Sequence, residues 1–193
     1  VERFVQLQAN PLLGLYNLDL LNAITTLIWV PAYLALYAAQ RKASGPYALL
    51  ALVVFLVGTA IFVTNNAALT MLELSTKYAA ATESQKMLFA AAGEGMLARG
   101  AHGSLGVFIG FLLPIAAGLL MSLAMRAGKV FSRATAWVGI AGSLLMIVYM
   151  ILVTFAPGVQ SMATIFAMPG GLLMIAWMIL FARRLMHLSR NGG

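Results

Sequence analysis

The sequence predicts an all-α, polytopic membrane protein, built as one bundle of transmembrane helices. Two observations support this fold class. Of the 193 residues, 62% are hydrophobic and only 9% are charged, a composition that cannot cover the apolar surface of a soluble domain. The hydrophobic residues also gather in long runs, each followed or preceded by a short charged or glycine-containing connection. Lipid is therefore the expected solvent, and residues 1–193 are expected to form a single domain.

Five apolar runs are the expected transmembrane helices. Each is long enough to cross about 30 Å of hydrocarbon at about 1.5 Å per residue. Backbone groups in lipid must find hydrogen-bond partners within their own segment, so each run should be helical. The expected spans cover residues 16–39, 47–70, 101–125, 134–155 and 162–185.

Most connections between these runs are short, and residues 71–100 form the one long connection. Within it, residues 84–97 are alanine-rich, moderately apolar and too few to span a membrane. They predict a short interfacial helix on the outer face, with Ser84 as its N-cap. Long connections are more often functional than short ones.

The charged residues divide between the two ends of the predicted bundle. One end carries four cations and all five acids, namely Arg3, Lys77, Lys86, Arg99, Glu2, Asp19, Glu73, Glu83 and Glu94. The other end carries eight cations and no acid, namely Arg41, Lys42, Arg126, Lys129, Arg133, Arg183, Arg184 and Arg190. The positive-inside bias places the eight cations in the cytoplasm. We therefore expect a bacterial-type cytoplasmic (inner) membrane, a cytoplasmic carboxy terminus and an external amino terminus.

An external amino terminus is difficult to translocate without a leader. Residues 2–10 are too polar to be the apolar core of a signal peptide. We therefore expect the natural protein to have one more span upstream of Val1, which would make six.

Two spans carry small residues at one-turn spacing. Gly106 and Gly110 share a face of the third span, and Thr135, Gly139 and Ser143 share a face of the fourth. Such faces allow close helix packing where no hydrophobic force acts between helices in lipid. We expect packing within one chain, with homodimerisation as the alternative.

Polar residues recur at helical spacing near the outer end of two spans. The first stripe is Asp19, Asn22, Thr26 and Tyr33, and the second is Asn66, Thr70, Glu73 and Lys77. Arg99 and His102 lead into the third span beside its glycine face. These segments predict one outer polar region, with Arg99 paired to Asp19 or Glu73. The candidate ligand-binding residues are Asp19, Asn22, Glu73, Arg99 and His102.

Three interpretations of this polar region remain open. It can be a structural clasp of ion pairs and hydrogen bonds, or a site for a small molecule, a lipid headgroup or a proton. A metal site is the weakest of the three, because no tight His-x-x-His or Glu-x-x-His spacing supports it. His102 and His187 lie at opposite ends of the bundle and cannot ligate one haem together. We expect no cofactor and no metal.

The remaining motifs exclude several classes of protein. The net charge of +7 comes from cations at the ends of apolar runs, which indicates membrane lipids rather than nucleic acid as partners. The sequence has no cysteine, which excludes disulfides, thiolate metal sites and cysteine nucleophiles. No nucleophile elbow, P-loop or dinucleotide turn is present, so no enzyme class is indicated.

One segment resembles a known family. The sequence NPLLGLYNLDLLN at residues 10–22, followed by a tryptophan-bearing span and a basic turn, is similar to a group of uncharacterised bacterial multi-pass membrane proteins, classified as a domain of unknown function (4386-like). Members of that kind typically have an additional amino-terminal span. The resemblance implies no substrate and no catalytic residues.

Two functions follow as expectations. The first is the binding or transport of a small amphiphile, lipid or other solute through the outer polar region. The alternative is a non-catalytic accessory subunit that docks on other membrane subunits.

Overall fold

The computed structural model describes residues 1–100, 104–156 and 158–191. Every regular element in these ranges is an α-helix. In chain order the helices are α1 (Glu2–Ala9), α2 (Pro11–Tyr16), α3 (Leu20–Asn65), α4 (Ala68–Ala80), α5 (Glu83–Gly100), α6 (Leu105–Gly128), α7 (Arg133–Phe155) and α8 (Gln160–Asn191). The all-α fold predicted from composition is confirmed.

The long helix α3 is a hairpin of two antiparallel limbs. Its helical path breaks at Ser44, where φ is −147° and ψ is 39°. Tyr33 and Phe55 lie equally far from Ser44 along the chain, and their rings stack with centroids 3.9 Å apart. Pro46 lies at the start of the second limb. The first N–H groups of a helix have no acceptor within the helix, so proline costs no hydrogen bond at this position. The predicted spans at residues 16–39 and 47–70 correspond to these limbs.

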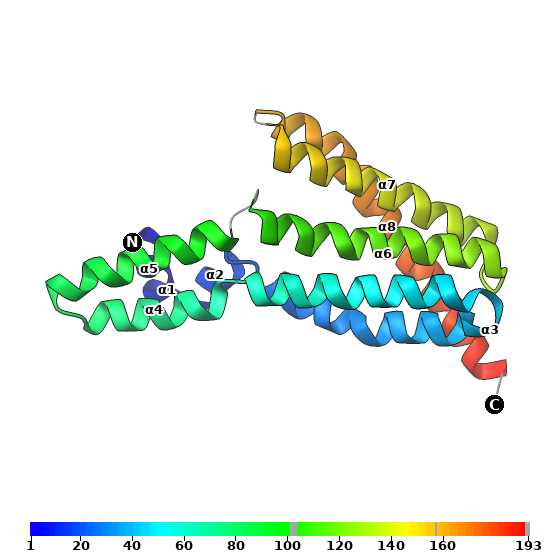
Figure 1. Cartoon of the computed structure of the whole chain (residues 1–193), viewed down its shortest axis with the longest axis horizontal. Coiled ribbons are helices and arrows are strands. Elements are labelled where there is room, and N and C mark those ends of the chain that lie inside the picture. The colour runs from blue at the N-terminus through cyan, green and yellow to red at the C-terminus, as the bar shows by residue number, and fades with distance from the viewer. Residues whose placement is uncertain (101–103, 157, 192–193) are drawn as a thin grey trace.

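Four helices of the described chain are long and apolar enough to cross a membrane. Because the first of them folds back at Ser44, the chain passes along the bundle five times (Figure 1). The predicted ends shift most clearly in the two limbs of α3, while α6 ends at Gly128 rather than at residue 125 and α8 covers Gln160–Asn191 rather than residues 162–185. The first limb begins at Leu20 rather than at Tyr16, which belongs to α2, and the second limb ends at Asn65 rather than at Thr70.

Small residues allow the helices of the bundle to approach closely. A methyl group on Gly110 would lie 2.9 Å from Cα of Phe62, and one on Gly106 would lie 2.7 Å from Cγ of Asn65. The glycine face of α6 is therefore seated on the second limb of α3. A methyl group on Gly139 would lie 2.6 Å from Nε1 of Trp177. Both predicted small-residue faces serve packing within one chain.

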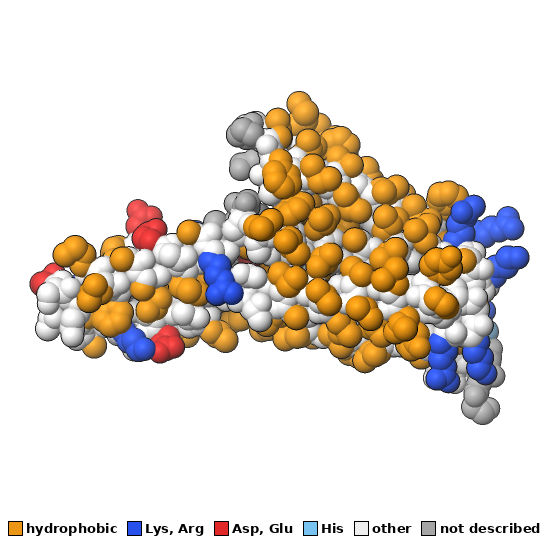
Figure 2. All heavy atoms as spheres, viewed as in Figure 1, with side chains coloured by type: hydrophobic (Ala, Val, Ile, Leu, Met, Phe, Trp, Pro, Cys, Tyr) orange, Lys and Arg blue, Asp and Glu red, His pale blue; other side chains and the backbone are white. Residues whose placement is uncertain are grey.

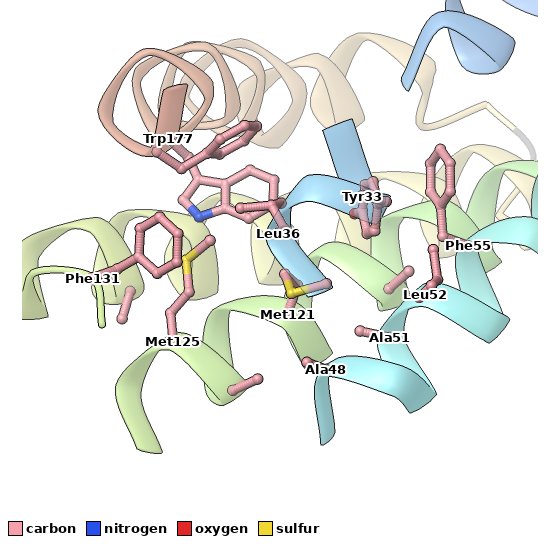
Figure 3. Packing of buried hydrophobic residues seen from close by; sticks show 14 residues of the cluster. Tyr33, Leu36, Ala48, Ala51, Leu52, Phe55, Met121, Met125, Phe131 and Trp177 are labelled. Atoms are coloured by element: carbon pink, nitrogen blue, oxygen red, sulfur yellow. The ribbon is translucent and has the colours of Figure 1, made fainter. Parts of the chain in front are cut away.

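The core of the bundle lies between α3, α6, α7 and α8, as Figure 3 shows. Trp177 of α8 is 1% exposed and packs edge-on against Phe181, with ring centroids 4.8 Å apart. Phe131, from the α6–α7 connection, belongs to the same cluster. By contrast, large apolar side chains on the outside of the bundle are widely exposed (Figure 2). An apolar outside around a packed inside is what a lipid environment permits.

Helices α1, α2, α4 and α5 form a projecting region, which extends beyond one end of the bundle along its long axis (Figure 1). It has its own small core of Phe4, Leu7, Ala67 and Met71. Phe4 packs against Tyr78 at 5.2 Å between ring centroids. Gly93 of α5 makes room for it, since a methyl group there would lie 2.6 Å from Cζ of Phe4.

The structure corrects the predicted outer helix at residues 84–97. Residues 68–100 form two helices, α4 and α5, which pack against each other and follow the axis of the bundle instead of lying across its end. The N-cap is Thr82 rather than Ser84. The Thr82 N–H donates to Oε1 of Gln85 over 3.1 Å, and the backbone N–H of Lys86 donates to the Thr82 carbonyl. The Gln85 side chain thus accepts from the N–H of the N-cap residue, which is one half of a capping box.

The end of the bundle opposite the projecting region is hereafter the basic end. Figure 2 shows Lys and Arg side chains gathered there. They come from the turn of α3, the α6–α7 connection and the end of α8, namely Arg41, Lys42, Arg126, Lys129, Arg133, Arg183, Arg184 and Arg190.

Candidate functional site

A cavity of about 400 Å³ lies where the bundle meets the projecting region. The end of α3, the start of α4, the end of α5 and the start of α6 converge on it, together with α1 and the α2–α3 turn. Its polar lining consists of Arg3, Asn17, Asp19, Asn65 and Asn66. Its apolar lining includes Leu18, Phe62, Leu97 and Val107. We call this space the junction cavity.

Asp19 reaches the junction cavity from the tight turn that precedes α3. Its backbone is left-handed, with φ of 60° and ψ of 23°, a conformation that aspartate tolerates better than most residues. Oδ1 of Asp19 accepts a hydrogen bond from Nδ2 of Asn22 over 3.1 Å. Both side chains also line a smaller hollow of about 300 Å³ beside Asn17. The predicted proximity of Asp19 and Asn22 is therefore confirmed.

Asn66 ends α3 and fixes the turn that leads to α4. Its ψ of 123° is extended, so the helix cannot continue through it. Its Nδ2 donates to the carbonyl of Leu18 over 3.0 Å, and its Oδ1 accepts from the backbone N–H of Ala68. One side chain thus ties the turn before α3 to the turn after it, and this holds the cavity walls together.

Asn65 is the second amide in the cavity wall and joins three helices. Its Nδ2 donates to the Ile61 carbonyl over 2.8 Å within α3. Its Oδ1 accepts from Nε of Arg99, at the end of α5, over 2.8 Å. On α6, Gly106 leaves space for this amide group.

Arg99 lies beside the cavity and bonds to its wall. The sequence predicted an ion pair between Arg99 and Asp19 or Glu73, and this prediction is wrong. Within the described part of the chain, Arg99 makes no such pair, and its second hydrogen bond goes to the Thr64 carbonyl over 3.1 Å. The last carbonyls of a helix lack intrahelical partners and carry the negative end of its dipole. The end of α3 therefore offers the guanidinium an alternative to a carboxylate.

Glu73 is not among the residues that line the junction cavity. It pairs with Lys77 one turn later over 2.6 Å, and its side chain is 66% exposed. The hydrogen bond and the charge of Lys77 lower the pKa of Glu73 below its ordinary value. The predicted stripe from Asn66 to Lys77 is broken at its start, because Asn66 ends α3 and does not share a helical face with Glu73. Thr70, Glu73 and Lys77 all lie on α4, as their spacing predicted.

His102 lies outside the described residues. Glu94 lies 3.8 Å from the amino-terminal nitrogen of Val1. Among the residues that the structure describes, no group of three or more His, Asp or Glu side chains could hold a metal ion.

Side chains of opposite charge, Arg3 and Asp19, line the junction cavity from two different elements. Arg3 donates from Nη1 to Oε1 of Gln6 on its own helix over 2.8 Å, and Asp19 accepts from its neighbour Asn22. Across the described residues, Arg3 and Asp19 form no ion pair with each other. The cavity thus presents a cation, an anion and amide groups, each with capacity for further hydrogen bonds.

Sequence reasoning missed three residues of the polar lining, Arg3, Asn17 and Asn65. Asn65 and Asn66 are two adjacent amides at the end of a long apolar run, and asparagine is a common residue at helix ends. That signal could have placed the helix end here. No local signal identifies Arg3, because only the packing of α1 on α4 carries it to the cavity.

The packed bundle of long apolar helices, capped by a helical region at one end, defines a polytopic helical membrane protein. The chain belongs to the family of the domain of unknown function DUF4386, whose family model matches residues 7–181. The resemblance seen in residues 10–22 is therefore confirmed. No curated protein and no solved structure matches the chain.

Proposed function

We propose that this membrane protein binds a small zwitterionic amphiphile in the junction cavity, at the outer side of a bacterial-type cytoplasmic membrane. The observation that carries the proposal is the pair of opposite charges, Arg3 and Asp19, which line one cavity without bonding to each other. A ligand that carries both charges would complement the two side chains. Asn17, Asn65 and Asn66 would add neutral hydrogen bonds and orient it.

The apolar part of the cavity supports an amphiphile rather than a fully polar solute. Leu18, Phe62, Leu97 and Val107 share the lining with the charged and amide groups. A headgroup between Arg3 and Asp19 could therefore extend an apolar chain past these side chains. The volume of about 400 Å³ is at the small end of the usual range for ligand sites.

Binding is better supported than passage through the bundle. Phe62 at the cavity packs against Phe111 with ring centroids 4.5 Å apart. Tyr33 and Phe55 stack between the limbs of α3. The packed side chains below the cavity favour a site with one entrance. The sidedness of the charges, by the positive-inside bias, supports an entrance on the outer face.

The test compares two ligands that share acyl chains and differ in headgroup. The purified full chain in a nonionic maltoside is titrated with dihexanoylphosphatidylcholine or with dihexanoylglycerol, and the thermal shift is followed. We expect saturable stabilisation by the zwitterion alone. Arg3→Gln and Asp19→Asn should each weaken it about tenfold, the usual effect of losing one charged hydrogen bond. Glu73→Gln, a charge change on an exposed pair away from the lining, is the matched control. Equal responses to both ligands would overturn the proposal.

A second candidate function, an accessory subunit, is favoured by apolar side chains on the projecting region. Met87 and Leu88 on α5 are 74% and 71% exposed, beyond the end of the bundle. Exposed apolar side chains outside the membrane indicate contact with another surface. Gentle extraction followed by native mass measurement separates the two functions. The accessory-subunit function predicts a complex of larger mass that is lost in Met87→Ser and Leu88→Ser. A lone chain would count against that function.

A further inference from the structure

The basic end of the bundle carries a second hollow, larger than the junction cavity. Its volume is about 690 Å³, and it lies at the connection between α6 and α7. Three cations line it, Arg126, Lys129 and Arg133. Leu123 and Trp137 contribute an apolar side, on the outward faces of the two helices. We call this space the basic hollow.

The connection that forms the basic hollow is held in place by three contacts. Phe131 is 5% exposed and anchors the connection in the bundle core. Nε of Arg184, near the end of α8, donates to the Val130 carbonyl over 3.0 Å. Lys129 adopts a left-handed backbone with φ of 56°, and its N–H donates to the Met125 carbonyl over 3.2 Å. The backbone of this turn is therefore fixed, and little backbone entropy is lost when a ligand binds beside it.

The same turn packs against the turn of α3. A methyl group on Gly128 would lie 2.8 Å from Oγ of Ser44. Arg41 and Lys42 precede Ser44 by a few residues on that turn. The positive potential of the basic hollow is thus reinforced by neighbouring cations, and the sequence places no acid at this end of the bundle to offset it.

One of the three cations, Arg133, is placed where an anion would stabilise it. Arg133 is the first residue of α7, at the positive end of the helix dipole, and the first turn of α7 has no acidic residue. A cation at that position is unfavourable on its own, whereas an anion there is favourable. The guanidinium of Arg126 lies 5.0 Å from the ring centroid of Trp137. This cation–π contact holds Arg126 over the apolar side of the hollow.

We infer that the basic hollow binds the phosphate group of an anionic phospholipid. Arg126, Lys129 and Arg133 would surround the phosphate, and its acyl chains would run along the outer faces of α6 and α7. Leu123 and Trp137, 43% and 54% exposed, offer apolar surface for those chains directly beside the cations. A free phosphate would use the cations and leave this surface unused. Basic pockets between membrane helices are suited to lipid headgroups of this charge.

The experiment is native mass spectrometry of the intact chain released from detergent, with phosphatidylglycerol and phosphatidylcholine of identical acyl chains added in equal amounts. We expect retained phosphatidylglycerol to exceed phosphatidylcholine by about tenfold or more, given two or three charged contacts. The double variant Arg126→Gln with Lys129→Gln should abolish that preference. The control, Arg183→Gln with Arg190→Gln, removes the same charge from the end of α8, outside the lining, and should retain the preference.

Two results would overturn the proposal. One is an equal loss of the preference for phosphatidylglycerol in the two double variants, because the preference would then depend on net charge and not on the basic hollow. The other is protection by inorganic phosphate in a thermal-shift assay without any effect of phosphatidylglycerol, because the site would then hold a soluble anion. Retained circular dichroism in both double variants shows that the chain still folds.

Discussion

Nε of Arg99 donates a hydrogen bond to Oδ1 of Asn65 over 2.8 Å, and the same guanidinium donates to the Thr64 carbonyl over 3.1 Å. The two bonds tie the end of α5 to the end of α3, although 34 residues separate the two side chains. Asn65 in turn lines the junction cavity. The end of the projecting region is therefore fixed to the bundle through the wall of the proposed binding site.

Removing the Asn65 amide should loosen this junction. Asn65→Ala deletes the acceptor of Arg99 and the donor to Ile61, and we expect unfolding free energy to fall by about 1–3 kcal/mol. Chemical denaturation in detergent measures it. Asn22→Ala is the control, since Asn22 is exposed and its side chain bonds only to Asp19, one turn away, in the described contacts. Equal losses in the two variants would contradict a special role for Asn65.

The contact between α6 and α3 depends on the absence of a side chain at Gly110. In Gly110→Ala the added methyl group would meet Cα of Phe62 at 2.9 Å, and backbone cannot move aside cheaply. We expect a loss of about 1–3 kcal/mol from overpacking. Gly171→Ala in α8, where nothing lies within 4 Å of the added methyl, is the matched control and should be neutral or stabilising. Thermal melting of both variants decides the matter, and a neutral Gly110→Ala would refute the close contact.

The pH response of Glu73 follows from its pair with Lys77. The pKa of Glu73 is lowered in the folded state, so any stability from the pair is present above the ordinary carboxyl pKa and lost as pH falls through the lowered value. Since the pair is widely exposed, solvent screens it. In Lys77→Gln, NMR titration should show the Glu73 pKa raised toward its ordinary value, with no measurable change in Tm. An unchanged pKa would contradict the pairing.

The absence of cysteine makes sidedness directly measurable. Single cysteines at Ser84, near the start of α5, and Ser189, near the end of α8, report the two ends of the molecule. In intact cells, a membrane-impermeant maleimide should label Ser84→Cys and spare Ser189→Cys, and membrane disruption should expose both. The reverse pattern would contradict the orientation inferred from the eight cations at the basic end.

The bundle was predictable from sequence because hydrophobic length alone forces helices in lipid. The separation of Arg126, Lys129 and Arg133 from every acid was equally visible. The end of the second span was misplaced, because apolar residues resume after Asn66 in α4 and the two adjacent amides, Asn65 and Asn66, were not interpreted as a helix end.

The candidate site was predicted in part. Asp19 and Asn22 lie where their spacing placed them, and Asp19 lines the junction cavity. Glu73 was misassigned because helical periodicity was extended across Asn66. The partner of Arg99 is an amide and a carbonyl at a helix end, and such partners leave no charge pattern in a sequence. Arg3 reaches the cavity through long-range packing alone.

The most direct measurement of the proposed function is photocrosslinking with a zwitterionic phosphatidylcholine that carries a diazirine in its headgroup. The crosslinked sites are mapped by mass spectrometry of peptides from the full chain. If the junction cavity binds the headgroup, crosslinks will concentrate at residues 17–19 and 65–67 and will be lost in Asp19→Asn. Crosslinks spread along the lipid-facing sides of α6, α7 and α8, unchanged by Asp19→Asn, would contradict it.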